Sequence, residues 1–127
     1  MTQPFATLCN MKKHSRNLVL VIALLIGTTI AQTPSINGIY SVVGSHQSGT
    51  KYTGKAVIRQ TGQVYVVGWT LNDSSTYKGI GVLQGSHFAV TWTPCGVSSY
   101  TVRGNVLDGV WAGCSDTKMG KETLTRR

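Results

Sequence analysis

The sequence predicts an all-β fold, namely one eight-stranded antiparallel meander that forms a closed or nearly closed small barrel after a cleaved signal peptide. From Ile36 onward, short apolar stretches alternate with Gly, Asn, Asp and Ser at intervals of about ten residues, as in sandwiches and barrels. Glycines recur within these stretches, where closure of a small barrel needs bulges and sharp bends. The 127 residues leave room for one such domain, which we place at residues 32–127.

Residues 1–31 are expected to direct export and then to be removed. A basic region from Lys12 to Arg16 precedes an uncharged apolar run from Leu18 to Ile26. Thr29 and Ala31 follow at the last positions of a small-residue cleavage site, which completes the order of a secretory signal peptide. The alternative is a membrane anchor, but the run is far shorter than the ~20 residues that cross a bilayer. We therefore expect a secreted or periplasmic protein with no stable membrane span after cleavage.

The start of translation and the cysteine count are linked to this signal. Met11 would open a compact basic region, so residues 1–10 are expected to be a mis-called start. Cys9 lies in the removed segment, and the exported domain keeps Cys95 and Cys114. Two cysteines in a small exported domain predict one disulfide. Its loop of about 20 residues would contribute roughly 3 kcal/mol to stability.

Processing also lowers the charge of the chain. The net charge of +8 becomes +5, because nine basic residues then face four acidic ones. This balance is compatible with an extracellular protein or an anionic envelope polymer as partner, and equally with ordinary solubility. Lys51, Lys55 and Arg59 share one face of the second expected strand, where a solvated outer face explains them as well as nucleic acid does. We expect no nucleic-acid partner.

The expected strands follow one another as a series of hairpins. In chain order they span residues 38–43, 51–60, 63–71, 76–83, 86–93, 97–102, 106–112 and 121–125. Turn-forming residues separate them, for example at Gly62, Gly85 and the pair Gly104-Asn105. With a two-residue loop at Gly104-Asn105, each residue of the strand before the loop pairs with the residue of the next strand whose number brings the sum to 209. Cys95 is therefore expected opposite Cys114.

Alternation with a period of two identifies the inward face of each strand. In chain order, the expected inward residues are Tyr52, Ala56, Ile58, Tyr65, Val67, Trp69, Leu71, Phe88, Val90, Trp92, Tyr100, Val102, Leu107, Gly109 and Trp111. Eight strands leave an interior that side chains fill or that holds one small ligand. The aromatic residues suit either case, so Trp69, Trp92, Trp111, Tyr65 and Tyr100 are candidate pocket residues. A cavity above about 300 Å³ lined by the tryptophans would favour a small-molecule ligand.

Patterns for catalysis and metal binding are weak. His46 and His87 remain after processing, each near a turn, and no spacing nominates a catalytic triad. Two separated histidines and a disulfide leave no set of three metal ligands. Asp108 and Glu122 could form a carboxylate pair across strands, but we expect each to form a structural salt bridge with Lys or Arg instead. We expect no enzymatic activity, no cofactor and no metal, and a hydrolase that uses either histidine is the least favoured hypothesis.

A short motif suggests an inhibitor. Residues 48–52 read Ser-Gly-Thr-Lys-Tyr, which resembles the Ser-Gly-x-x-Tyr pattern of secreted C-type lysozyme inhibitors, also small disulfide-bearing β-barrels. Here the pattern falls in the first hairpin rather than late in the chain. The resemblance implies a secreted inhibitor of an enzyme such as lysozyme, with His46, Ser48 and Tyr52 as candidate loop contacts.

A broader pattern runs through residues 38–125. Its motifs are Gly38-x-Tyr40-x-Val42, Tyr52-x-Gly54, Tyr65-x-Val67-x-Trp69, Tyr77-x-Gly79-x-Gly81, Val90-x-Trp92, Leu107-x-Gly109-x-Trp111 and Gly120-x-Glu122-x-Leu124. In these the chain resembles a group of small exported bacterial β-barrel proteins often labelled fibronectin-binding proteins, which are largely uncharacterised. The motif residues are core and turn positions, so the resemblance implies an architecture, and the label implies adhesion to host matrix. Our leading hypothesis is a non-enzymatic binding module whose ligand, a host-matrix or cell-envelope component among the candidates, is undetermined.

Overall fold

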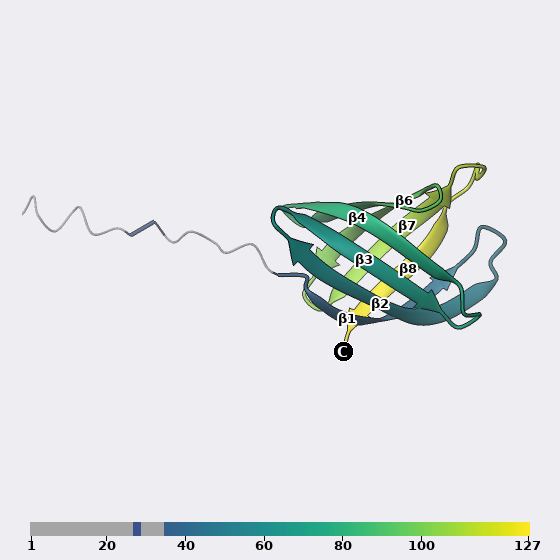
Figure 1. Ribbon diagram of the computed structural model, residues 1–127, viewed down its shortest axis with the longest axis horizontal. Helices are drawn as coiled ribbons and strands as arrows, with labels where there is room; N and C mark the ends of the chain where they lie inside the picture. The colour runs from purple at the N-terminus through teal and green to yellow at the C-terminus, as the bar shows by residue number, and fades with distance from the viewer. Residues whose placement is uncertain (1–26, 29–34) are drawn as a thin grey trace, which may run out of the picture. The chain divides into compact units, whose positions relative to one another are not determined.

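The computed structural model describes residues 27–28 and 35–127, and residues 38–126 form one closed barrel (Figure 1). The strands are β1 (Gly38–Ser45), β2 (Lys51–Thr61), β3 (Val64–Leu71), β4 (Thr76–Gln84), β5 (His87–Trp92), β6 (Gly96–Arg103), β7 (Val106–Gly113) and β8 (Gly120–Arg126). Each strand pairs antiparallel with the next, and β1 also pairs with β8. The predicted all-β class, strand number and meander order are confirmed.

The expected signal peptide and the choice between Met1 and Met11 fall outside the described residues, apart from Gly27 and Thr28, which are in neither helix nor strand. The described part of the chain contains no helix long and apolar enough to cross a membrane.

The two ends of the barrel differ in their connections. At one end, two-residue turns join β2 to β3, β4 to β5 and β6 to β7. Gly62, Gly85 and Gly104 begin these turns with φ of 62°, 60° and 58°, the backbone conformation that the first central residue of a type II′ turn adopts. The connections at the other end are longer, and the opening described below lies at that end (Figure 1).

The end with the short turns is sealed from inside. Ile36 is 1% exposed, and its carbonyl accepts a hydrogen bond of 2.7 Å from the Tyr40 hydroxyl. Arg126 donates to the same hydroxyl from Nε at 3.3 Å and from Nη2 at 3.1 Å. Its Nη2 also donates to the Ser35 carbonyl at 2.6 Å. The segment before β1 and the last residues of β8 therefore form a plug, and the interior opens toward the longer connections.

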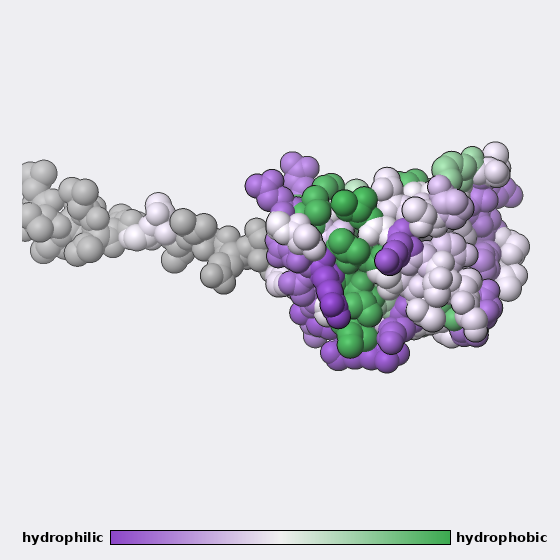
Figure 2. Space-filling model, in the orientation of Figure 1, coloured by the Kyte–Doolittle hydropathy of each residue, from purple (hydrophilic) through white to green (hydrophobic). Residues whose placement is uncertain are grey.

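Side chains alternate between the interior and solvent along most strands, as the period of two predicts, whereas β7 is half-buried from Gly109 onward. The fully buried large residues are Ile36, Tyr40, Val42, Ile58, Val67, Phe88, Val90, Tyr100, Leu107 and Leu124. Burial is partial at both ends of the barrel. The partly buried residues are Leu83 and Val102 toward the short turns and Leu71, Tyr77, Trp92 and Trp111 toward the open end. The outer face is not wholly polar: Figure 2 shows apolar side chains over β3 and β4, where exposed Val66 and Ile80 pair across the strands.

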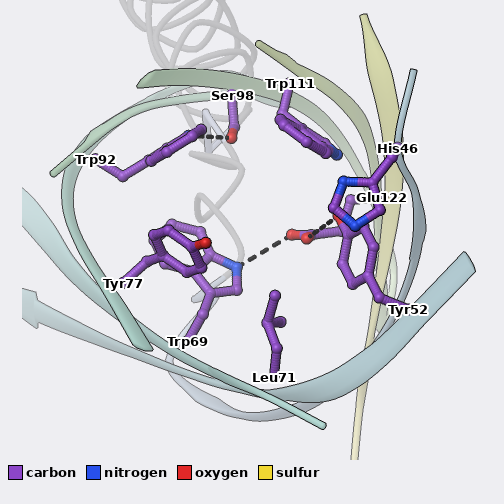
Figure 3. A pocket seen from close by; sticks show the side chains of 9 residues that line it. All are labelled: His46, Tyr52, Trp69, Leu71, Tyr77, Trp92, Ser98, Trp111 and Glu122. Carbon is purple, nitrogen blue, oxygen red and sulfur yellow. Dashed lines mark hydrogen bonds between the residues drawn. The ribbon is translucent and has the colours of Figure 1, made fainter. Parts of the chain in front are cut away.

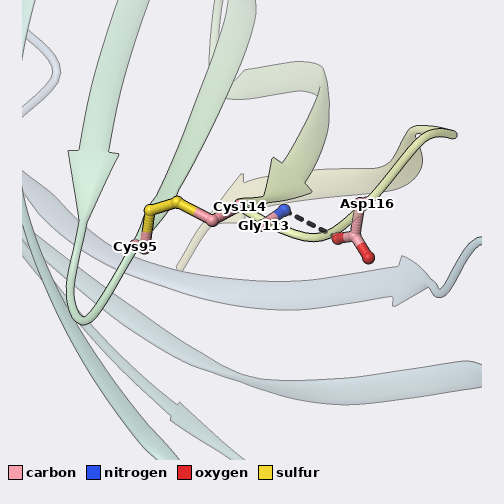
Figure 4. The surroundings of a disulfide bond; sticks show 4 residues. All are labelled: Cys95, Gly113, Cys114 and Asp116. Carbon is pink, nitrogen blue, oxygen red and sulfur yellow. Dashed lines mark hydrogen bonds between the residues drawn. A yellow bond between two sulfur atoms is a disulfide. The ribbon is translucent and has the colours of Figure 1, made fainter.

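The predicted register and disulfide are both confirmed. In the β6–β7 hairpin Gly96 pairs with Gly113 and Tyr100 with Gly109, so the residue numbers sum to 209. Cys95 and Cys114 form a disulfide just beyond these strands, with their Cα atoms 5.5 Å apart (Figure 4). The hairpin is thus fixed at one end by its turn and at the other by a covalent bond.

Candidate ligand-binding pocket

A cavity of about 70 Å³ opens at the end of the barrel that carries the longer connections. Side chains from seven strands and one loop surround it (Figure 3). The lining residues are His46, Tyr52, Trp69, Leu71, Tyr77, Trp92, Ser98, Trp111 and Glu122. The pocket is therefore a property of the closed barrel, because no single hairpin supplies its walls.

Aromatic rings form most of the wall. The rings of Trp92 and Trp111 lie 6.1 Å apart between centroids, and those of Tyr77 and Trp92 lie 5.4 Å apart at 76°. These tilted, edge-to-face arrangements are the ones that aromatic pairs prefer. Trp92 Nε1 also donates to Ser98 Oγ at 3.0 Å, which fixes the orientation of the indole.

Glycines on neighbouring strands make room for these rings. Trp92 is paired with Gly96 across β5 and β6, and Trp111 with Gly120 across β7 and β8. A Cβ atom at either glycine would overlap the indole of its partner. Each ring therefore lies flat over the backbone of the adjacent strand, and the glycine determines which way it points.

A buried carboxylate lies at the base of the pocket. Glu122 is 6% exposed and accepts three hydrogen bonds. Oε1 accepts from Trp69 Nε1 at 3.1 Å and from the Tyr100 hydroxyl at 2.6 Å, while Oε2 accepts from the Tyr52 hydroxyl at 2.7 Å. A carboxylate surrounded by donors matches the ionised form, because a protonated carboxyl must itself donate.

The structure corrects the expectation that Asp108 and Glu122 form salt bridges, because it gives both carboxylates neutral partners. Like Leu124, two residues further along β8, Glu122 points into the barrel. The groups that donate hydrogen bonds to it are neutral. Asp108 pairs in register with Thr123 on the outer face and accepts a hydrogen bond of 3.1 Å from its hydroxyl. The two carboxylates therefore lie on opposite sides of the barrel wall.

The two tyrosines that donate to Glu122 have raised pKa values. Burial is the largest cause of the raised pKa of Tyr52 and of Tyr100, and the negative charge of Glu122 and its hydrogen bond to each phenol raise the pKa further. Both phenols consequently keep their protons at neutral pH and remain donors to the carboxylate.

The predicted pocket residues separate into two groups. Trp69, Trp92 and Trp111 do line the cavity. Tyr65 and Tyr100 lie deeper and do not line it. Tyr65 packs edge-on against Phe88 at 5.6 Å, and Tyr100 supports Glu122 from below. Alternation identified the inward face correctly but carried no information about depth along the barrel.

The three predicted loop contacts, His46, Ser48 and Tyr52, do not lie on one common surface. Exposed His46 lies at the rim, with its ring 5.1 Å from Tyr52 and 5.6 Å from Trp111. Ser48 is exposed in the turn and shares a 3.1 Å hydrogen bond with the Thr50 hydroxyl. Tyr52 is directed into the barrel, because its hydroxyl bonds to Glu122. His87 begins β5, at the end of the barrel opposite to His46.

Sequence reasoning missed Leu71, Tyr77, Ser98 and Glu122 as members of this site. The alternation carried a signal for three of them, because it had already placed Leu71 inward, and Ser98 is in phase with inward Tyr100 and Glu122 with inward Leu124. Within residues 35–127, no group of three or more His, Cys, Asp or Glu side chains is placed to hold a metal ion.

Comparisons with known proteins inform the fold alone. No protein-family model matches the chain, and no curated protein matches it. Among solved structures, the chain is similar to a de novo designed fluorescence-activating beta barrel, with a TM-score of 0.50 and 15% identity. That match covers 72% of this chain and 93% of the designed one. At this identity the likeness supports the barrel architecture and carries no statement about a ligand.

Proposed function

We propose that this protein is a non-enzymatic binding module that takes the compact head group of a ligand into the open end of its barrel. The observation that carries the proposal is the half-buried state of Trp92 and Trp111 around a cavity. Rings that served the core alone would be fully buried, as Phe88 is. Large apolar surface left open in a concave site is typical of ligand binding.

The size of the cavity limits what it can hold. A cavity needs about 10–15 Å³ to hold one water molecule, so 70 Å³ has room for a few waters. This is well below the 300 Å³ that we set for a complete small-molecule ligand. A compact head group fits the cavity, and the rest of a larger ligand would extend past His46 into solvent.

Two polar groups of the pocket, Glu122 and Ser98, favour binding over catalysis. Both oxygens of Glu122 accept hydrogen bonds from protein donors, and Ser98 Oγ accepts from Trp92. Groups that hold one another in this way fix the shape of a site, whereas a catalytic base or nucleophile must be free to exchange protons with its substrate.

Export to the periplasm or the exterior remains part of the proposal. The disulfide between Cys95 and Cys114 supports it, because such bonds persist in oxidising compartments. We expect the protein to be recovered outside the cytoplasm, and N-terminal sequencing should find Gln32 as its first residue. Recovery of the full chain in the cytoplasm, with both cysteines reduced, would contradict it.

A screen of small organic compounds by intrinsic tryptophan fluorescence tests the pocket. We expect at least one charged or neutral compound to change the emission with saturation. The change should be lost in Trp92→Leu, and it should persist in Val97→Ala, which alters an exposed apolar residue of β6. A complete absence of saturable changes would contradict the proposal.

An enzyme inhibitor is the second candidate, because exposed His46 and Ser48 form an accessible turn between β1 and β2. Its geometric support is weaker, since Tyr52 is committed to Glu122. Lysozyme inhibition that is abolished by Ser48→Ala and unaffected by Trp92→Leu would favour this candidate over the pocket.

A further inference from the structure

We infer that the pocket selects a small cation with apolar substituents, such as a trimethylammonium head group. The inference rests on the proposed function and names the chemical class of its ligand. Three features of the site lead to it: the unbalanced negative charge of Glu122, the aromatic walls, and the scarcity of free hydrogen-bond acceptors.

The charge comes from one residue. Glu122 is the acidic member of the lining set, which includes neither lysine nor arginine. Its three hydrogen-bond donors, Tyr52, Trp69 and Tyr100, are neutral groups that stabilise the anion without cancelling its charge. In a partly dehydrated pocket, that charge attracts a cation more strongly than it would in water.

The walls suit a cation as well. Trp69, Tyr77, Trp92 and Trp111 surround the open centre of the pocket (Figure 3). The rings of Trp92 and Trp111 are tilted by 66° to each other, and those of Tyr77 and Trp92 by 76°, so the walls face the centre from different directions. Cations bind favourably within about 6 Å of such rings, with tryptophan the strongest partner, and quaternary ammonium groups are recognised in this way.

The hydrogen-bond inventory distinguishes between kinds of cation. A primary ammonium carries three donors that need acceptors. Both oxygens of Glu122 already accept hydrogen bonds, and Ser98 Oγ accepts from Trp92. The other acceptors of the lining are the Tyr77 hydroxyl and the His46 ring, while the buried Trp111 Nε1 is a donor without a partner among the described residues. A divalent metal ion would need several oxygen ligands, and the lining set holds one carboxylate. A fully alkylated ammonium needs no acceptor and fills an apolar cavity with its methyl groups.

The test compares choline with its neutral carbon isostere, in which a tert-butyl group replaces the trimethylammonium group. The two have the same shape and differ in charge. Binding to the purified protein is followed by tryptophan fluorescence at about pH 8. We expect the Kd for choline to be at least about tenfold lower than that for the isostere.

Glu122→Gln should bring the Kd for choline to within about twofold of the Kd for the isostere, because the shape of the side chain stays and its charge is removed. Asp108→Asn is the matched control. It removes a carboxylate from the outer face of the neighbouring strand, and it should leave the preference for choline unchanged. Circular dichroism checks that both variants fold, and the comparison of the two ligands on the unaltered protein stands without them.

The outcomes separate this inference from the proposed function. Equal binding of choline and the isostere would overturn the cationic class and leave the pocket supported. Binding of neither ligand would overturn the cationic class as well, while the compound screen decides on the pocket independently. Equal loss of choline binding in Glu122→Gln and Asp108→Asn would also contradict the inference, because the effect would then come from the overall charge of the protein.

Discussion

At the scale of single residues, Glu122 connects four strands through its side chain. From β8 it accepts hydrogen bonds from Tyr52 on β2, Trp69 on β3 and Tyr100 on β6. These donors come from opposite sides of the barrel, so one carboxylate orients several walls of the pocket. The same residue supplies the charge that we assign to ligand binding, and its structural and functional effects must therefore be measured separately.

Glu122→Ala should lower the free energy of unfolding by about 3 kcal/mol or more, because it leaves three buried donors without an acceptor at about 1–3 kcal/mol each. Glu122→Gln should cost less, since its amide oxygen still accepts from two of them. Urea denaturation measures both, with Asp108→Ala as the exposed control. A change below about 0.5 kcal/mol in Glu122→Ala, the size of an ordinary surface substitution, would contradict this role.

Alkaline pH should destabilise the fold through Tyr100. Its pKa is raised above the ordinary value of 10.0, mainly by burial and then by the charge of Glu122. The unfolded chain therefore releases this proton at a lower pH than the folded chain does. The stabilisation is complete below about pH 10 and falls by up to ~1.4 kcal/mol per pH unit above it.

Tyr100→Phe removes the titrating group and is the comparison for that measurement. The variant should be less stable at neutral pH, because a hydrogen bond to Glu122 is lost, and its stability should decline less steeply above pH ~10. Urea denaturation at several pH values gives both quantities. Identical alkaline slopes for the variant and the parent protein would show that Tyr100 does not control the effect.

At the scale of strands, paired glycines and aromatic residues set the shape of the open end. Gly96 and Gly120 lie in register with Trp92 and Trp111, so the sheet itself determines where the indoles rest. Gly68 on β3 differs, because a Cβ atom there would contact nothing within 4 Å. The two kinds of strand glycine therefore have separable roles.

Gly120→Ala should displace the Trp111 indole and lower the free energy of unfolding by about 1–3 kcal/mol, the usual cost of overpacking. Gly68→Ala is the matched control and should change stability by less than about 0.5 kcal/mol. Denaturation curves and tryptophan emission spectra measure both effects. Equal effects of the two substitutions would show that the pairing with Trp111 is not the cause.

The disulfide acts on the β6–β7 hairpin. Cys95 and Cys114 are 19 residues apart in sequence, so their bond restricts a loop of the unfolded chain. Replacing both with alanine should lower the free energy of unfolding by about 3 kcal/mol. The measurement is urea denaturation of this double variant beside the parent protein, each with and without reductant. A reductant should destabilise the parent alone, and an equal response of both proteins would contradict the assignment.

At the scale of the whole molecule, the barrel could be predicted from the sequence because the signals for it, alternation along strands and short turns, are local and periodic. Alternation identified the inward residues, and one two-residue turn was enough to predict the β6–β7 register and the disulfide. Depth along the barrel was not predictable, because it depends on which end the plug formed by Ile36 and Arg126 seals. The role of Glu122 was missed because a charged residue is rarely buried, so a surface salt bridge was the natural expectation.

The central claim is that the open end of the barrel binds a cation with apolar substituents. It is tested most directly by NMR, because the chain has three tryptophans and all of them line the pocket. Titration with choline should shift the indole N–H signals of Trp92 and Trp111 with saturation, while the backbone amide of Ile36 at the sealed end stays in place. The neutral isostere should produce much smaller shifts at the same concentration. Unchanged indole signals, or equal shifts with both compounds, would contradict the claim.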